Sequence, residues 1–84
     1  MNSKQRKTLS AVFKKPPPAN LDWDDIESLL LAVGCEIIEG NGSRVRFSKD
    51  QAIAIFHRPH PTNEAKRHHI RQARDYLESI GVTP

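Results

Sequence analysis

The side chains best suited to chemistry are two histidines and an arginine that precedes them in the chain. His57 and His60 lie at the end of an alternating apolar segment, and Arg44 opens the segment before it. Histidine takes up and releases protons near neutral pH, as a general acid or base must. Arginine keeps its proton far above neutral pH, so Arg44 can bind phosphate or stabilise negative charge but cannot act as a base. Together these residue types suit proton transfer on a bound phosphate ester.

Two predicted strands would bring these side chains together. Arg44–Ser48 and Ala52–Arg58 both alternate along the chain, which is the pattern of strands with one buried face. Lys49-Asp50 is the expected turn between them. Pairing around that turn places the start of the first strand opposite the end of the second. We therefore expect one cluster near a sheet edge, formed by Arg44, Arg46, His57, Arg58 and His60.

A second group of cations lies in the predicted last helix. That helix should be capped by Thr62 or Asn63 and run to about Ser79. The basic residues of its first half include Lys66, Arg67 and Arg71. These three and Arg58 could gather with the strand arginines into a phosphate-binding face, and a simple solvated face is the alternative. His68 and His69 are expected on the solvent-facing side of this helix.

Length and composition restrict the class of protein. The chain has 84 residues, 13 Lys and Arg against 10 Asp and Glu, and one cysteine. A chain this short buries roughly 60 per cent of its unfolded surface, so an enclosed cofactor pocket is not expected. No apolar run approaches the ~18 residues of a membrane helix, and no signal peptide is recognisable. No histidine and cysteine spacing fits a metal site. We expect a cytoplasmic domain with a polyanionic partner, not a membrane or small-molecule one.

The order of predicted elements indicates an α+β fold. Residues 1–19 form a basic segment without acids that ends in three prolines, read as a helical arm on a stiff spacer. Its alternatives are a partly ordered tail, or an arm that grips RNA or docks a partner. Residues 20–84 contain a helix ending near Gly34, three strands beginning with Cys35–Glu39, and the last helix. This α-β-β-β-α order, with both helices on one face of an antiparallel sheet, is the plan of double-stranded-RNA-binding-like folds.

The region from Trp23 to Pro84 resembles the HicA toxin family. The matching features are the stretch Gly42-Ser43-Arg44-Val45-Arg46-Phe47, the Pro59-His60-Pro61 step, and helices that end at Gly34 and Gly81. The resemblance implies the toxin of a type II toxin–antitoxin system. Such a toxin is a metal-independent mRNA endoribonuclease that inhibits translation, needs no cofactor, and is neutralised by a HicB-like antitoxin.

One position departs from the family pattern. The catalytic histidine of the family usually follows a Gly-Ser pair, and Arg44 follows that pair here. Another histidine would then have to transfer protons, and His57 or His60 is the candidate, with Arg44 stabilising the charged phosphate. The alternatives are a non-catalytic RNA-binding module of the same fold and a protein whose main role is to bind an antitoxin.

Overall fold

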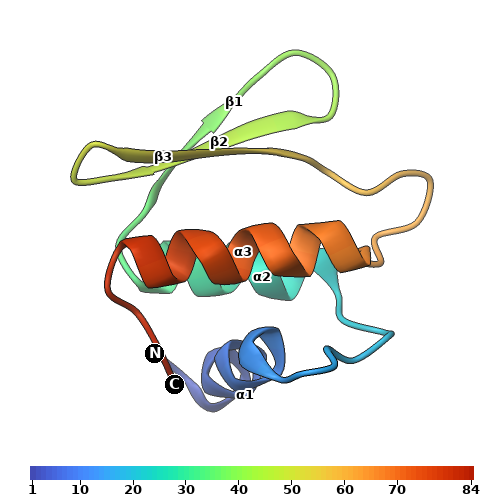
Figure 1. The fold of residues 1–84 in the computed structure, drawn as a ribbon. Coiled ribbons are helices and arrows are strands. Elements are labelled where there is room, and N and C mark those ends of the chain that lie inside the picture. Colours follow the sequence, from blue (N-terminus) through green and yellow to red (C-terminus); the bar gives the residue numbers. More distant parts are fainter.

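The chain folds into three layers, and a computed structural model describes all 84 residues. The elements are α1 (Ser3–Phe13), α2 (Trp23–Ala32), β1 (Glu36–Glu39), β2 (Arg44–Lys49), β3 (Ala52–His57) and α3 (Arg67–Ser79). The sheet forms one layer, α2 and α3 form the next layer beneath it, and α1 lies beneath them (Figure 1). The expected α+β arrangement of helices and a three-stranded antiparallel sheet is confirmed. None of the helices combines the length and apolar character needed to cross a bilayer.

The sheet has the strand order β1-β2-β3, and both pairings are antiparallel. The hairpin between β2 and β3 turns at Asp50 and Gln51, whose φ angles are 49° and 72°. Positive φ at both central residues gives the turn a twist that fits the flanking strands. The turn lies one residue later than the expected Lys49-Asp50, so β2 continues through Lys49.

The helix α2 begins and ends close to its predicted limits. Asp24 and Asp25 lie in its first turn, where their negative charges interact favourably with the positive end of the helix dipole. Gly34 follows the helix with a φ of 100°, a conformation that disfavours residues with a Cβ. The ammonium group of Lys49 donates to the carbonyl oxygen of Val33 at 2.6 Å, which links this helix end to the end of β2.

The helix α3 begins later than the capping pattern predicted. Thr62 and Asn63 do not cap it, because the segment before the helix bonds to the chain entering α2 instead. The backbone N–H of Trp23 donates to the carbonyl oxygen of Asn63 at 2.8 Å, and that of Ala65 donates to Leu21 at 2.8 Å. Lys66 is the N-cap residue. The backbone groups of Asn63 and Ala65 are therefore bonded to the segment before α2, so they are not part of a longer α3.

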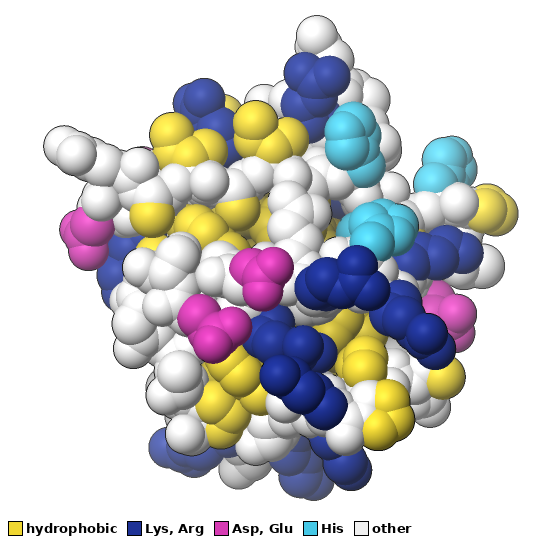
Figure 2. Space-filling model, viewed as in Figure 1, with side chains coloured by type: hydrophobic (Ala, Val, Ile, Leu, Met, Phe, Trp, Pro, Cys, Tyr) yellow, Lys and Arg dark blue, Asp and Glu magenta, His cyan; other side chains and the backbone are white.

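The helix α1 packs against the rest of the fold and is not a detached arm. Leu9 and Val12 are buried in the same hydrophobic cluster as residues of α2 and α3. The Gln5 side chain donates to the Ser28 hydroxyl of α2 at 2.9 Å, and the guanidinium of Arg74 donates to the carbonyl oxygen of Val12 at 3.0 Å. Figure 2 shows Lys and Arg side chains over the outer side of this layer.

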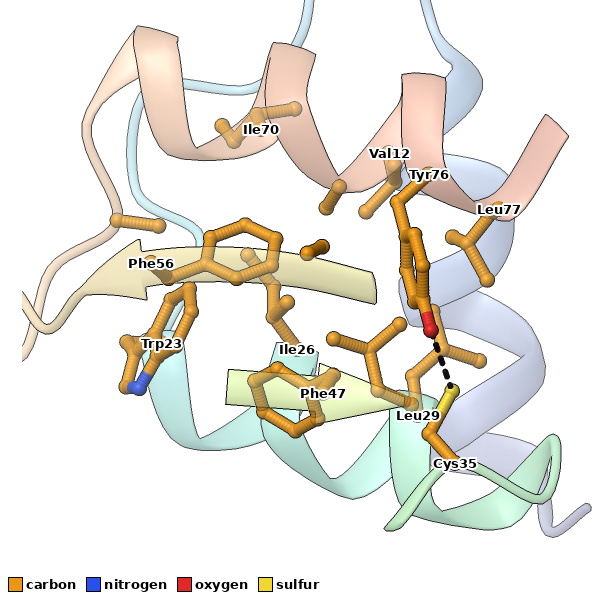
Figure 3. Packing of buried hydrophobic residues seen from close by; sticks show 14 of the residues in the cluster. Val12, Trp23, Ile26, Leu29, Cys35, Phe47, Phe56, Ile70, Tyr76 and Leu77 are labelled. Carbon is orange, nitrogen blue, oxygen red and sulfur yellow. Dashed lines mark hydrogen bonds between the residues drawn. The ribbon is translucent and has the colours of Figure 1, made fainter. Parts of the chain in front are cut away.

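The core lies between the sheet and the helices and contains 16 buried residues. Trp23, Phe47 and Phe56 form its aromatic centre, with ring centroids 5.2 Å apart for Trp23–Phe56 and 5.7 Å for Phe47–Phe56 (Figure 3). Burying one such large apolar side chain stabilises the fold by about 1.5–3 kcal/mol. Trp23 and Phe56 are therefore buried side by side in the core.

Cys35 is a free cysteine buried in this core. Its sulfur lies 3.8 Å from the hydroxyl oxygen of Tyr76 (Figure 3). Burial raises the pKa of the Cys35 thiol, which keeps it protonated at neutral pH. The Tyr76 hydroxyl donates to the carbonyl oxygen of Ala52 at 2.9 Å and so ties α3 to the start of β3.

Candidate functional site

Arg44 and His57 are direct cross-strand partners on the outer face of the sheet. They are paired in the register of β2 and β3, and both side chains are exposed. Directly opposite residues in an antiparallel pair have Cβ atoms about 4.5–5.5 Å apart. A guanidinium and an imidazole can therefore reach the same phosphate group. This proximity confirms the predicted strand pairing that joins the two residues.

The outer sheet face around this pair combines cations with exposed apolar side chains. Arg46 lies opposite Ile55, two residues from the Arg44–His57 pair and on the same face. Ile38, Ile53 and Ile55 are 42%, 55% and 49% exposed, whereas Val45 and Phe47 on the opposite face of β2 are fully buried. Isoleucines exposed to this degree on one sheet face indicate a surface that contacts another molecule.

The loop before β2 brings the backbone close to Arg44. The N–H of Gly40 donates to the carbonyl oxygen of Arg44 at 2.9 Å. A Cβ on Gly40 would lie 3.1 Å from both the Cβ and the carbonyl oxygen of Arg44, a tight contact that favours glycine at this position. Gly42 has a φ of 63° and completes the turn. The glycines of this loop therefore fix where the strand carrying Arg44 begins.

His69 is buried, contrary to the expected surface position, and holds the end of β3. Only 3% of the residue is exposed. Its Nδ1 accepts the backbone N–H of Lys66 at 2.9 Å, and its Nε2 lies 2.7 Å from the carbonyl oxygen of His57. Because a backbone N–H can only donate, Nδ1 is unprotonated and Nε2 carries the proton that it donates to His57. One neutral ring thus joins the first turn of α3 to the residue beside Arg44.

The position of His69 could have been found from helical spacing. His69, Ala73 and Tyr76 follow one another at intervals of four and three residues, which places them on one face of a helix. Ala73 is an apolar residue that is fully buried in the core, so its neighbour one turn earlier belongs to the core as well. The adjacent His68 is exposed, and its ring centroid lies 4.0 Å from that of His69.

The titration of His69 predicts a loss of stability in mild acid. Burial lowers the pKa of His69, and the nearby His68, Lys66 and His57 oppose a further positive charge. The unfolded chain, with an ordinary histidine pKa of about 6.5, therefore binds the proton first as the pH falls. We expect the free energy of unfolding in urea to decrease as the pH falls below about 6.5. His69→Gln, whose amide can both donate and accept without titrating, should flatten this decrease.

The matched control for this measurement is His60→Gln, because the His60 ring is exposed and makes no hydrogen bond. This variant should keep the pH dependence of the wild-type chain. Equal pH dependence in His69→Gln and in the wild-type chain would contradict the assignment of the buried neutral histidine.

Arg58 is not available for the predicted cluster, because two glutamates hold its guanidinium. Its Nε lies 2.6 Å from Glu27 of α2, and its two terminal nitrogens donate to the carboxylate of Glu39 at 2.6 and 2.9 Å. These contacts raise the pKa of Arg58 and lower that of Glu39. Trp23 also donates its indole N–H to Glu27, at 2.5 Å. Arg58 follows Phe56 on the inner side of the strand and joins β3 to α2 and β1.

Removing this guanidinium should destabilise the fold. In Arg58→Met the partly buried carboxylate of Glu27 loses its ionic partner, and the bidentate pair with Glu39 is lost as well. We expect the free energy of unfolding in urea to fall by about 1 kcal/mol through the partly buried Glu27 pair, with no large contribution from the exposed Glu39 pair. Arg46→Met is the matched control, because Arg46 is exposed and forms no ion pair. Equal stability of the two variants would show that the ion pairs of Arg58 do not stabilise the fold.

The cations of α3 lie at the same end of the molecule as His57. Lys66, Arg67 and Arg71 are exposed, and the bond from His69 to His57 fixes their helix against the end of β3. Figure 2 shows histidines beside a run of Lys and Arg side chains that continues over α3. His60 lies in the exposed loop between them. The structure therefore brings Arg44, His57 and the cations at the start of α3 to one end of the molecule, whereas Arg58 is held in ion pairs. No three His, Cys, Asp or Glu side chains lie together as a metal site.

The chain also matches a known family. Residues 23–82 match a family model described as "HicA toxin of bacterial toxin-antitoxin". The match includes α2, the whole sheet and α3, and it leaves α1 outside. No curated protein and no solved structure matches the chain significantly.

Proposed function

The chain belongs to the HicA toxin family, and we propose that it is an endoribonuclease that cleaves mRNA without a metal ion and thereby inhibits translation. As a member of this family it is the toxin of a toxin–antitoxin system and has an antitoxin as its partner. The proposal concerns the reaction, the substrate and the residues that act on it.

The observation that carries the proposal is the pairing of Arg44 with His57 on an exposed sheet face. Cleavage of RNA without a metal needs a base, an acid and a cation near one phosphate. His57 supplies a group that exchanges protons near neutral pH, and Arg44 supplies a permanent positive charge directly opposite it. His57 is the only histidine in a strand, so no other cross-strand pair of this sheet combines the two groups.

In the proposed reaction, the neutral imidazole of His57 removes the proton of a ribose 2′-hydroxyl. The 2′ oxygen forms a bond to the adjacent phosphorus, and the bond from phosphorus to the 5′ oxygen of the next nucleotide breaks. A protonated histidine, for which His60 is the candidate, donates a proton to the leaving 5′ oxygen. Arg44 stabilises the added negative charge on the phosphorane. The products are a 2′,3′-cyclic phosphate and a 5′-hydroxyl.

The remaining cations would hold the RNA backbone. Arg46 lies beside the proposed centre on the sheet, and Lys66, Arg67 and Arg71 lie on the adjoining part of α3. Charged side chains that contact phosphates fix the register of a strand without selecting its sequence. We infer that these four residues orient the strand toward His57.

The antitoxin would cover the same sheet face, and we propose that it is HicB-like. Ile38 and Ile55 lie opposite Arg46 on the two neighbouring strands, and a protein partner would bury them together with Ile53. Such a partner would block access of RNA to Arg44 and His57. Both proteins would act in the cytoplasm, where mRNA is translated.

Expression in bacteria tests this function. Induction of the chain should stop growth and fragment cellular mRNA, and co-expression of its antitoxin should prevent both effects. A His57→Ala variant expressed to the same level should be tolerated. Growth arrest with intact mRNA would show that the toxin acts on another target.

A second function is favoured by one specific position. Arg44 occupies the place after Gly42-Ser43 where the family usually has its catalytic histidine. A chain without catalysis would still bind RNA through the same cations, as a shape- and phosphate-reading module. Tight RNA binding by folded protein that leaves the RNA intact would favour this module over the nuclease.

A further inference from the structure

The outer side of α1 contains an open hollow lined by cations. Its volume is about 740 Å³. The lining residues that define it are Arg6, Lys7, Phe13, Lys14, Pro18 and Pro84. Phe13 is half-buried, so part of its ring faces this space. The hollow lies on the layer farthest from the sheet, and all of its lining residues are outside the range that matches the family.

The cations of this hollow have no acidic partners in the fold. Arg6, Lys7 and Lys14 are exposed and form no ion pair, whereas Lys4 on the same helix lies 3.7 Å from Asp25. The first 19 residues contain five Lys and Arg and no Asp or Glu. An uncompensated set of positive charges in a concave surface attracts a polyanion more strongly than the same charges on a convex one.

A row of arginines on α3 leads from the hollow toward the proposed cleavage centre. Arg67, Arg71 and Arg74 are spaced by four and three residues, so they follow one side of the helix over about 10 Å. Arg67 lies beside the helix start that is bonded to His57. Arg74 donates to Val12, two residues before Lys14. Figure 2 shows Lys and Arg side chains both over α3 and over the layer of α1 below it.

We propose that the hollow on α1 binds the sugar–phosphate backbone of a single-stranded RNA whose next segment crosses α3 to reach Arg44 and His57. Phe13 provides a ring on which a base can stack, and Arg6, Lys7 and Lys14 contact phosphates. Charged grooves combined with aromatic side chains are the usual means of holding single strands without sequence preference. This inference rests on the proposed function, because it assigns RNA as the shared ligand. An acidic segment of the antitoxin is the other occupant, and the test separates the two.

Two double variants with the same loss of charge test the proposal. Arg6→Gln with Lys14→Gln removes two cations that line the hollow. Lys4→Gln with Lys15→Gln removes two cations of the same segment that do not line it. All four side chains are exposed, and the Lys4–Asp25 contact at 3.7 Å is a surface pair of small expected energy, so urea unfolding should show that both variants stay close to the stability of the parent. Every protein also carries His57→Ala, so that the RNA stays intact during binding.

The readout is the affinity for single-stranded RNA of about 4 and about 12 nucleotides, a range typical of such sites. The hollow variant should bind the longer RNA about tenfold more weakly and the shorter RNA as the parent does. For the longer RNA, the negative slope of log affinity against log salt concentration should become shallower by about 1.4, because two phosphate contacts of about 0.7 each are lost. The control variant should retain most of the affinity and the slope.

Three results would overturn the inference. They are equal losses in both double variants, equal losses on short and long RNA, and a loss of antitoxin binding while RNA binding is unchanged. The last result would assign the hollow to the antitoxin. Failure of the proposed nuclease is a separate outcome, because the chain with His57 intact would then bind the long RNA through the hollow and leave it uncut.

Discussion

Replacing His57 with alanine is expected to slow RNA cleavage by about 10²–10⁴-fold, the usual contribution of one general acid or base. The exposed imidazole lies opposite Arg44 and would take the 2′-hydroxyl proton. The substitution removes only the exposed side chain, so the backbone carbonyl that accepts from His69 remains. The rate should be measured under single-turnover conditions with the purified chain and a labelled single-stranded RNA.

His68→Ala is the matched control for this variant, because His68 is also exposed and lies at the same end of the molecule. It should change the cleavage rate little. If His57→Ala cleaved RNA as fast as the parent and His68→Ala cleaved it slowly, His68 of α3 and not His57 would be the residue that transfers the proton. His60→Ala should also be slow if His60 protonates the leaving oxygen.

Replacing Arg44 with glutamine should lower the cleavage rate by about 10²–10³-fold, as expected when a group that stabilises transition-state charge is lost. The effect should appear mainly in kcat, because the added charge develops only as the phosphorane forms. Arg44→Lys keeps the charge without the planar fork and should recover only part of the rate. Steady-state kinetics on one RNA at constant salt concentration measures both parameters.

Arg46→Gln is the control for the Arg44 variant, since Arg46 lies on the same strand and face but opposite Ile55. Its loss should raise KM and leave kcat nearly unchanged, because a backbone contact exists before and during the reaction. If both variants change only KM, Arg44 binds RNA and has no part in the chemistry.

The sheet and the Arg44–His57 pair could be predicted from the sequence because both depend on local patterns. The alternation of Val45 and Phe47 with basic residues defines the two faces of β2. A short turn allows few registers between that strand and the next one, so it determines which residues lie opposite each other. The turn itself was predicted one residue early, which did not change the faces.

The roles of Arg58 and His69 could not be predicted as readily, since they depend on partners far away in the chain. Glu27 and Glu39 lie 31 and 19 residues before Arg58. Strand alternation did contain a signal, because Arg58 continues the face of the buried Phe56. Likewise, His69 reaches across 12 residues to His57. The sequence does not show which distant residues will form such hydrogen bonds. It shows only, through the spacing of apolar residues, which side chains lie on a buried face.

The N-terminal segment shows the limits of composition as a guide. Its basic residues and three prolines suggested a separate arm, yet Leu9 and Val12 fill the core beneath α2 and α3. An apolar stripe this short does not show from the sequence alone whether another part of the chain packs against it. The late start of α3 has the same origin, because the segment at Asn63 pairs with the entry to α2.

The most direct test of the nuclease uses the purified chain, excess EDTA and one defined RNA. A second RNA carries a single 2′-deoxy sugar on the 5′ side of the cut. The proposed reaction predicts that EDTA has no effect, that the RNA ends in a 2′,3′-cyclic phosphate, and that the deoxy substitution abolishes cleavage at that position. Cleavage that needs a metal ion, or that persists at the deoxy sugar, would contradict 2′-hydroxyl activation by His57 beside Arg44.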